Sequence, residues 1–252
     1  MAQRDRDGDH EVALRVFRQI VGAHDYPCLG ARSVLNRDRA TVRGYRGLGT
    51  VESARELLAD LAEFAERTDL TEGFASFVAV FDDRIEPDER TFERLLWRQL
   101  AAMRDVDPAP WDPRVSADPA DPDFAFSANG TAYFVVGLHP GASRPARRAP
   151  SPVLVFNPHE QFERLRAAGS YGRMRDTIRR RDLTANGSVN PMLSDHGQIS
   201  EARQYSGRRV GENWTAPFPA ATRAVCPVSG GAAPGPSDRR RAAVPAQRSA
   251  RH

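Results

Sequence analysis

The chain has 252 residues, of which 40% are apolar and 27% charged, with a net charge of +3. This length and balance are typical of a globular protein with a sizeable core rather than of a disordered chain. No apolar run approaches the roughly 20 residues of a membrane-spanning helix, and the charged first residues lack the apolar stretch of a secretory signal. Two cysteines, Cys28 and Cys226, are too few for a disulfide framework, so we expect a soluble protein of the reducing cytoplasm without a membrane partner.

The positive charge is concentrated at the end of the chain. Residues 221–252 hold six arginines against one acidic residue, Asp238, which leaves residues 1–220 with a net charge of −2. A nucleic-acid-binding protein carries its basic residues on a folded face, so we expect no nucleic-acid partner. The tail has too few large apolar residues to offset the entropy of ordering. We therefore predict one domain over 1–220 and a disordered tail over 221–252.

The first third of the chain alternates predicted helices and strands. Apolar residues recur at helical spacing over 11–21 and over 51–67, where Thr50 can cap the second helix. Residues 40–48 alternate weakly and indicate a strand. The aromatic and β-branched run over 74–81 predicts a stronger strand.

The middle of the chain predicts one more helix and two more strands. Asp88 can cap a helix, and the five prolines of residues 105–123 predict a long loop, pinned to the body by Trp111. Strands are predicted over 131–138 and 152–156. We expect a single α+β domain in which helices cover a mainly antiparallel sheet, with room for one parallel pair.

The predicted junction between a strand and a helix at Asn157 carries the clearest local signal. Asn157 suits the N-cap, Pro158 the first helical position and Glu160 the third, which together predict a capping box. His159 would then lie where the positive end of the helix dipole favours a neutral imidazole, ready to act as a base or a metal ligand. The same pattern also fits a histidine that only caps or packs.

His139 ends the preceding predicted strand in a similar way. If the two strands are neighbours, we expect His139 and His159 to lie at one edge of the sheet. The loop between the strands contains three arginines: Arg144, Arg147 and Arg148. Guanidinium groups bind carboxylates and phosphates bidentately, although a solvated basic loop would have the same composition.

Several kinds of catalytic site are excluded by the absence of their motifs. The chain has no glycine-rich phosphate loop, no HExxH, no CxxC and no nucleophile elbow. One cysteine within 1–220 excludes zinc or iron–sulfur sites built from thiolates. Haem is still permitted, because it needs one axial ligand such as histidine and basic groups for its propionates.

Five stretches of the sequence resemble the YqcI/YcgG family, in the order in which they occur there. They are YPCLGARS at 26–33, GLHPGASRPARR at 137–148, VFNPHEQFERLR at 155–166, GSVNPMLSDHG at 187–197 and SEARQYSGRRV at 200–210. Some relatives in this family look like haem-dependent oxygenases that N-hydroxylate a guanidine group, as on arginine. The resemblance covers residues 26–218.

The resemblance implies a haem-dependent oxygenase that N-hydroxylates a guanidine- or amine-bearing small molecule and receives electrons from a donor. The residue roles inferred on this basis are His159 as the first choice of iron ligand, His139 as the second, Arg144, Arg147 and Arg148 for the haem propionates, and Asp195 and Glu201 for a cationic substrate. Two other readings stay open: a non-catalytic haem or small-ligand binding protein, and a structural or interaction domain without a cofactor.

The chain departs from the family near its end. The family tends to close with Trp-x-Cys-Pro-Phe, whereas this chain has Ala216 in place of the cysteine. If that thiol matters to function, the activity is impaired. The Ala-, Pro- and Arg-rich tail resembles nothing in the family, and our hypothesis is a shifted reading frame late in a GC-rich gene. Sequencing the locus tests it, since an in-frame ending like that of the relatives would remove the idea.

Overall fold

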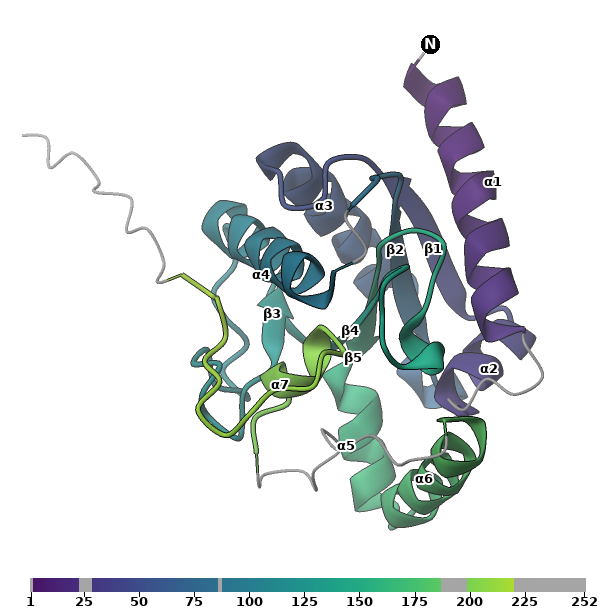
Figure 1. Cartoon of the computed structure of the whole chain (residues 1–252), viewed down its shortest axis with the longest axis vertical. Coiled ribbons are helices and arrows are strands. Elements are labelled where there is room, and N and C mark those ends of the chain that lie inside the picture. Colours follow the sequence, from purple (N-terminus) through teal and green to yellow (C-terminus); the bar gives the residue numbers. More distant parts are fainter. Residues whose placement is uncertain (1, 23–28, 86–87, 187–198, 220–252) are drawn as a thin grey trace, which may run out of the picture. The chain divides into compact units, whose positions relative to one another are not determined.

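The computed structural model describes residues 2–22, 29–85, 88–186 and 199–219 (Figure 1). The tail predicted over 221–252 lies outside these residues. The described residues form an α+β fold, with one five-stranded sheet and helices on both of its faces. No helix in this part of the chain is both long and apolar enough to cross a membrane.

The sheet has the strand order β1-β2-β5-β4-β3. Its strands are β1 (Ala40–Tyr45), β2 (Ser76–Phe81), β3 (Phe126–Ala128), β4 (Thr131–Leu138) and β5 (Val153–Pro158). Strands β1 and β2 are parallel and are connected by helix α3 (Val51–Arg67), and every other pair is antiparallel. The prediction of a mainly antiparallel sheet is therefore confirmed, and β1 and β2 form the one parallel pair that the sequence allowed.

Two predicted helix caps, Thr50 and Asp88, are confirmed. Besides α3, the helices are α1 (Ala2–Val21), α2 (Leu29–Asn36), α4 (Glu89–Val106), α5 (His159–Ala167), α6 (Tyr171–Asn186) and α7 (Ala202–Tyr205), with 3₁₀ turns η1 (Leu70–Glu72) and η2 (Pro145–Arg147). Thr50 accepts a hydrogen bond from the backbone N–H of Ser53 at the start of α3. Asp88 accepts from Arg90 and Thr91 at the start of α4. Both polar caps satisfy N–H groups that the helix cannot satisfy itself.

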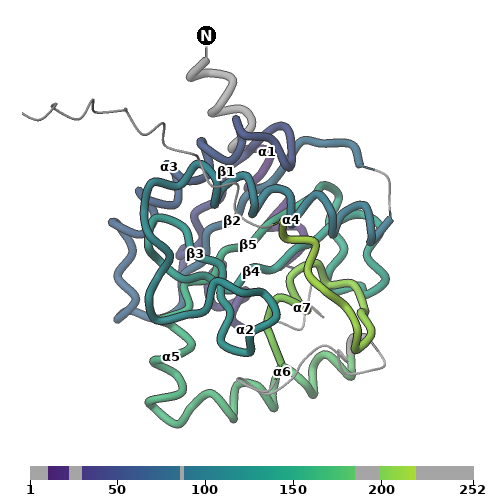
Figure 2. Tube along the Cα trace, turned by 90° about the vertical axis from the view of Figure 1, so that its left-hand side faces the viewer, coloured from purple at the N-terminus to yellow at the C-terminus, as the bar shows by residue number. Residues whose placement is uncertain are grey.

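Different helices cover the two faces of the sheet (Figure 2). Phe77, Val135 and Phe156 point to the face covered by α3 and α4, where the larger core cluster lies. Helix α1 packs its Phe17 and Val21 against the opposite face. Because side chains alternate along a strand, neighbouring residues of β4 and β5 face opposite layers.

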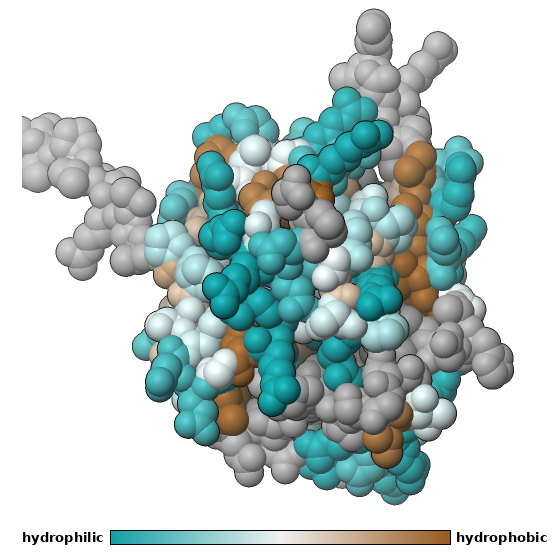
Figure 3. All heavy atoms as spheres, in the orientation of Figure 1, coloured by the Kyte–Doolittle hydropathy of each residue, from teal (hydrophilic) through white to brown (hydrophobic). Residues whose placement is uncertain are grey.

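Helix α1 packs one apolar stripe against the sheet. Ala13, Phe17 and Val21 are buried there, and Val16 and Ile20 pack against the same cluster, whereas Val12 is 55% exposed. Figure 3 shows an apolar strip along this helix on an otherwise mostly hydrophilic face. The helical periodicity predicted over 11–21 is therefore confirmed.

The capping box predicted at Asn157 is wrong. Strand β5 continues to Pro158, which pairs with Tyr133, so Asn157 lies within the sheet. Its Oδ1 accepts a hydrogen bond from Ser76 Oγ at 2.7 Å, and its Nδ2 donates to the carbonyl of Phe134 at 3.2 Å. The side chain of Asn157 therefore makes its hydrogen bonds within the sheet and does not cap α5.

Strand β3 was not predicted, because the proline-rich run before it was read as loop. Asn129 and Gly130 connect it to β4 with φ angles of 51° and 71°. Two such residues form a type I′ hairpin turn, and Asn-Gly is its strongest sequence signal. The predicted anchoring of the long loop by Trp111 is confirmed, since its ring packs against Phe124 and Phe126.

Candidate functional site

A cavity of about 270 Å³ lies against the face of the sheet that α1 covers only in part. Its floor consists of side chains from β4 and β5: Phe134, Val136, Leu138, Val153 and Val155. Parts of α1, α2 and α5 form its walls, and helix α6 lies across from the floor. Its volume is near the lower end of the range of small-molecule pockets, and its apolar floor is typical of them.

Helix α6 presents one face to the cavity. The lining residues on this helix are Tyr171, Met174, Arg175, Ile178, Arg179 and Asp182. Their spacing of three and four residues is that of a single helical stripe. This stripe was missed from the sequence, although the periodic positions of its apolar residues could have revealed it.

Charged side chains meet at the end of the cavity near the loop between β4 and β5. Arg144 Nη2 lies 2.8 Å from Asp182 Oδ2, and both side chains are largely buried. Arg147 donates hydrogen bonds to the carbonyls of Gly137 at 3.0 Å and Gln204 at 3.1 Å. Glu201 also lines the cavity there. We call these residues the ionic end.

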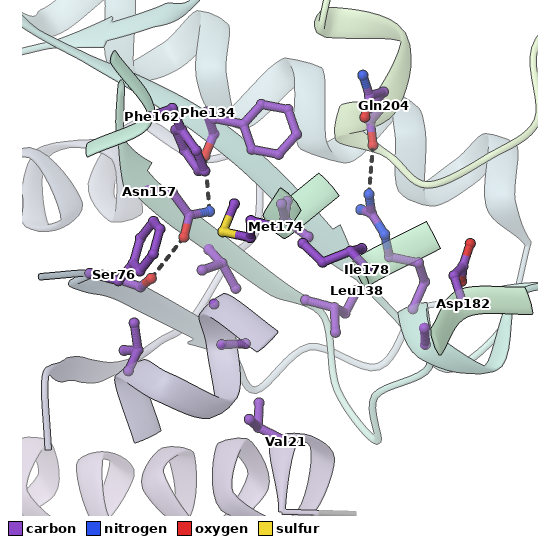
Figure 4. A pocket seen from close by; sticks show the side chains of 18 of the residues that line it. Val21, Ser76, Phe134, Leu138, Asn157, Phe162, Met174, Ile178, Asp182 and Gln204 are labelled. Atoms are coloured by element: carbon purple, nitrogen blue, oxygen red, sulfur yellow. Dashed lines mark hydrogen bonds between the residues drawn. The ribbon is translucent and has the colours of Figure 1, made fainter. Parts of the chain in front are cut away.

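The opposite end of the cavity carries neutral polar groups among aromatic rings. Figure 4 shows Ser76 and Asn157 with Phe134, Phe162 and Met174 on one side, and Asp182 and Gln204 on the other. We call the first group, together with Gln161 and Phe74, the amide end. Leu138 and Ile178 lie between the two ends. The cavity therefore offers a ligand two chemically different ends joined by an apolar middle.

Arginines outnumber acidic residues among the described lining residues. Arg144, Arg147, Arg166, Arg175 and Arg179 line the cavity together with Asp182 and Glu201. The lining therefore carries a net charge of +3 in the described residues. An excess of guanidinium groups around an apolar floor favours ligands that carry a carboxylate or another anionic group.

His139 lies on the other face of the sheet from the cavity. Its ring is fully buried and stacks on Phe92 of α4, with centroids 4.3 Å apart and an angle of 20° between the rings. Burial, the largest influence, lowers the pKa of His139. Neither ring nitrogen has a hydrogen-bond partner among the described residues. A fully buried ring stacked on Phe92 does not face an open hollow in which a porphyrin could bind.

His159 is the first residue of α5 and does not line the cavity either. Its Nδ1 lies 3.7 Å from Glu163 Oε1, one helical turn further along α5. This is the arrangement of a histidine that pairs along a helix surface. Neither histidine chosen from the sequence therefore fits a haem site at this cavity.

The two histidines also lie at opposite ends of the sheet, which corrects the expectation of a shared edge. Strands β4 and β5 are neighbours but antiparallel, with Leu138 paired to Val153 and Tyr133 to Pro158. His139 follows the end of β4 and His159 the end of β5, and these two strand ends are five residues apart along the sheet, or about 17 Å at about 3.3 Å per residue. Two neighbouring strands have their C-terminal ends at the same edge of the sheet only when the strands are parallel.

The remaining predicted site residues divide into three groups. Arg144, Arg147 and Glu201 line the cavity together. Arg148 does not, and its guanidinium donates to the carbonyls of Ala142 and Ser143. Asp195 lies outside the described residues. Within the described residues no group of three or more histidine, cysteine or carboxylate side chains could hold a metal ion.

These features define an α+β domain with an arginine-lined cavity on one face of its sheet. Residues 17–219 match the sequence model of the YqcI/YcgG family, so the chain belongs to this family. The resemblance seen in the motifs is thereby confirmed.

Two relatives come from Bacillus subtilis (strain 168). "Uncharacterized protein YcgG" is 26% identical over 195 residues, which cover 74% of this chain and 77% of that protein. "Uncharacterized protein YqcI" is 28% identical over 193 residues, which cover 71% of this chain and 74% of that protein. No solved structure matches the chain.

Proposed function

We propose that this chain is a haem-dependent oxygenase that N-hydroxylates a guanidine- or amine-bearing small molecule such as arginine, and that this molecule binds in the cavity. The observation that carries the binding half is that the carboxylate of Glu201 and several arginines line the same apolar cavity, as a ligand with both a cationic and an anionic group requires. A carboxylate with little access to water attracts a cationic group more strongly than one on the surface. The oxygenase half rests on the family resemblance.

The cavity residues suit a zwitterionic ligand in particular. Glu201 would accept hydrogen bonds from the cationic group of the ligand, since an ionised carboxylate is purely an acceptor. The arginines would bind its carboxylate, and Val136 and Val155 would contact its aliphatic carbons. In the overall reaction one oxygen atom enters the new N–O bond and the other leaves as water, with electrons and protons supplied by a donor.

Haem would activate O₂ in this reaction, and the two histidines chosen from the sequence do not fit that role. We therefore assign no axial ligand and derive no step through the iron. A second candidate function, a non-catalytic small-ligand binding protein, is favoured by the same observation that His139 and His159 both lie away from the cavity.

The proposal is tested with the purified full chain, haem, arginine, a reductant and O₂. A Soret band on addition of haem and a hydroxylated product by mass spectrometry would support the oxygenase. Glu201→Gln should weaken arginine binding at least tenfold, whereas Glu160→Gln, an exposed carboxylate paired with Arg164 on α5, should leave it unchanged. Arginine binding without a Soret band would overturn the oxygenase and support the second candidate. Absence of both would overturn both.

A further inference from the structure

The amide end of the cavity contains two side-chain amides whose orientation is fixed by the backbone. Gln161 Oε1 accepts a hydrogen bond from the backbone N–H of Ala75 at 3.1 Å. Asn157 Nδ2 donates to the carbonyl of Phe134 at 3.2 Å. An amide N–H can only donate and a carbonyl can only accept, so neither side chain can be flipped without losing its bond.

This orientation leaves a defined set of donors at the cavity. Gln161 is 5% exposed and lines the cavity, and its Oε1 is taken by Ala75. That bond does not involve Nε2, so the two Nε2 N–H groups can donate to a ligand at the cavity. A ligand acceptor at this wall of the cavity would therefore meet a donor whose direction is already set by the protein.

The same end presents acceptors a short way along the sheet. Ser76 Oγ donates to Asn157 Oδ1 at 2.7 Å, which uses the only hydroxyl proton of Ser76. Lone pairs remain on Ser76 Oγ and on Asn157 Oδ1, and both residues line the cavity. A ligand group that meets this surface therefore finds N–H donors from Gln161 beside oxygen acceptors from Ser76 and Asn157.

Aromatic rings surround these polar groups. Phe162 lies between Phe74, at a centroid distance of 6.2 Å, and Phe134, at 6.0 Å in an edge-to-face arrangement. Met174 of α6 lies close to this group in Figure 4. Aromatic and thioether side chains pack favourably on flat, polarisable groups.

We propose that Gln161, Asn157 and Ser76 form a subsite for a planar, uncharged group with an N–H donor next to an acceptor, such as a carboxamide or a nitrogen heteroaromatic ring. A guanidinium group does not match it, because guanidinium has no acceptor for the N–H groups of Gln161. The subsite rests on the proposed function only in that the cavity binds small molecules. A ligand that fills both ends carries its charged groups at the ionic end and a neutral planar group at the amide end.

Benzamide is the probe for this subsite, and acetophenone is its matched control. Acetophenone keeps the ring and the carbonyl acceptor but lacks the N–H donors. Titration calorimetry with the full chain at pH 8 should show benzamide binding at least tenfold more tightly than acetophenone, which corresponds to about 1.4 kcal/mol. Equal binding of the two compounds, or binding of neither, would overturn the subsite.

Gln161→Glu is the most specific variant for testing the subsite, because it keeps an oxygen acceptor for the backbone N–H of Ala75 and removes the two N–H donors of the side chain. It should weaken benzamide binding at least tenfold, and Ser76→Ala should also weaken it by removing an acceptor. Unchanged affinity in Gln161→Glu, with its fold verified by circular dichroism, would refute the assignment. Arginine separates this inference from the proposed function: Glu201→Gln acts on arginine affinity, whereas Gln161→Glu acts on benzamide affinity.

Discussion

The guanidinium of Arg144 lies 2.8 Å from the carboxylate of Asp182, and this ion pair joins the loop between β4 and β5 to helix α6. The side chains are 14% and 7% exposed. Removing one partner of a buried pair leaves the other charge away from water, so the loss is larger than for an exposed pair. The pair therefore holds the C-terminal half of the helix that covers the cavity.

Asp182→Asn should loosen helix α6. Loss of a buried charge partner costs about 3 kcal/mol, which corresponds to roughly 100-fold faster exchange of amides that open with the helix. Hydrogen exchange followed by mass spectrometry measures this over Tyr171–Asn186. The control is Asp176→Asn, because Asp176 is 57% exposed and pairs with Arg175 on the helix surface. Similar exchange rates in the two variants would show that the buried ion pair stabilises α6 no more than the exposed one does.

Gly137→Ala should destabilise the sheet where β4 meets α4. A Cβ atom at Gly137 would lie 2.7 Å from Phe92 Cε1 and 2.8 Å from Leu96 Cδ1, and both neighbours are fully buried. Overpacking of this kind costs about 1–3 kcal/mol. Urea unfolding followed by circular dichroism measures the change in the free energy of unfolding.

Gly172→Ala is the matched control for this substitution. Outside the backbone of its own helix, a Cβ atom there would have no atom within 4 Å, and the residue lies in the first turn of α6. Alanine is a better helix former than glycine by up to about 1 kcal/mol, so this variant should be neutral or slightly more stable. If both alanine variants behave alike, the close approach of α4 to β4 is not what requires glycine at 137.

Glu93→Ala should release the segment that follows α7. The largely buried carboxylate of Glu93 accepts hydrogen bonds from Arg208 Nη2 at 2.6 Å, Trp214 Nε1 at 3.2 Å and Ser206 Oγ at 3.3 Å. Its removal leaves a guanidinium and an indole N–H without their partner, at a cost of about 3 kcal/mol. Limited proteolysis should then cut within 206–219, and Trp214 fluorescence should shift to the red. A cleavage pattern like that of the unchanged protein would contradict this account.

Much of the fold was predictable because it depends on local chemistry. Thr50 and Asp88 cap helices as their residue types predict, and β4 begins and ends where its apolar run does. Asn157 shows the limit of such reasoning. Its sequence context is that of a helix cap, but a cross-strand hydrogen bond from Ser76, 81 residues away, decides its place. Only tertiary pairing could reveal that competition.

The candidate site was predictable only in part. Arg144, Arg147 and Glu201 were chosen for their charge and do line the cavity. The histidines were chosen for their place at strand ends, and the direction of pairing, which the sequence leaves open, puts them at opposite ends of the sheet. The polar residues of the amide end were missed, because Ser76 and Gln161 acquire their role only through folding.

His139 should make the protein less stable as the pH falls below about 7. Burial lowers its pKa most, Glu89 and Asp88 act in the opposite direction, and Arg147 adds to the lowering. The unfolded imidazole has a pKa near 6.5. As the pH falls below about 6.5, the unfolded chain takes up a proton that the folded chain still resists, so the free energy of unfolding decreases.

His139→Leu should remove this part of the pH dependence. At pH 7.5 the variant should be as stable as the unchanged protein or more stable, because the substitution removes two buried nitrogens that have no partner among the described residues. At pH 5 its advantage should be larger, since it has no imidazole to protonate on unfolding. Urea unfolding at the two pH values measures both free energies. If the difference between the two proteins is the same at both pH values, His139 does not resist protonation in the folded state, and the ring is not packed against Phe92 as described.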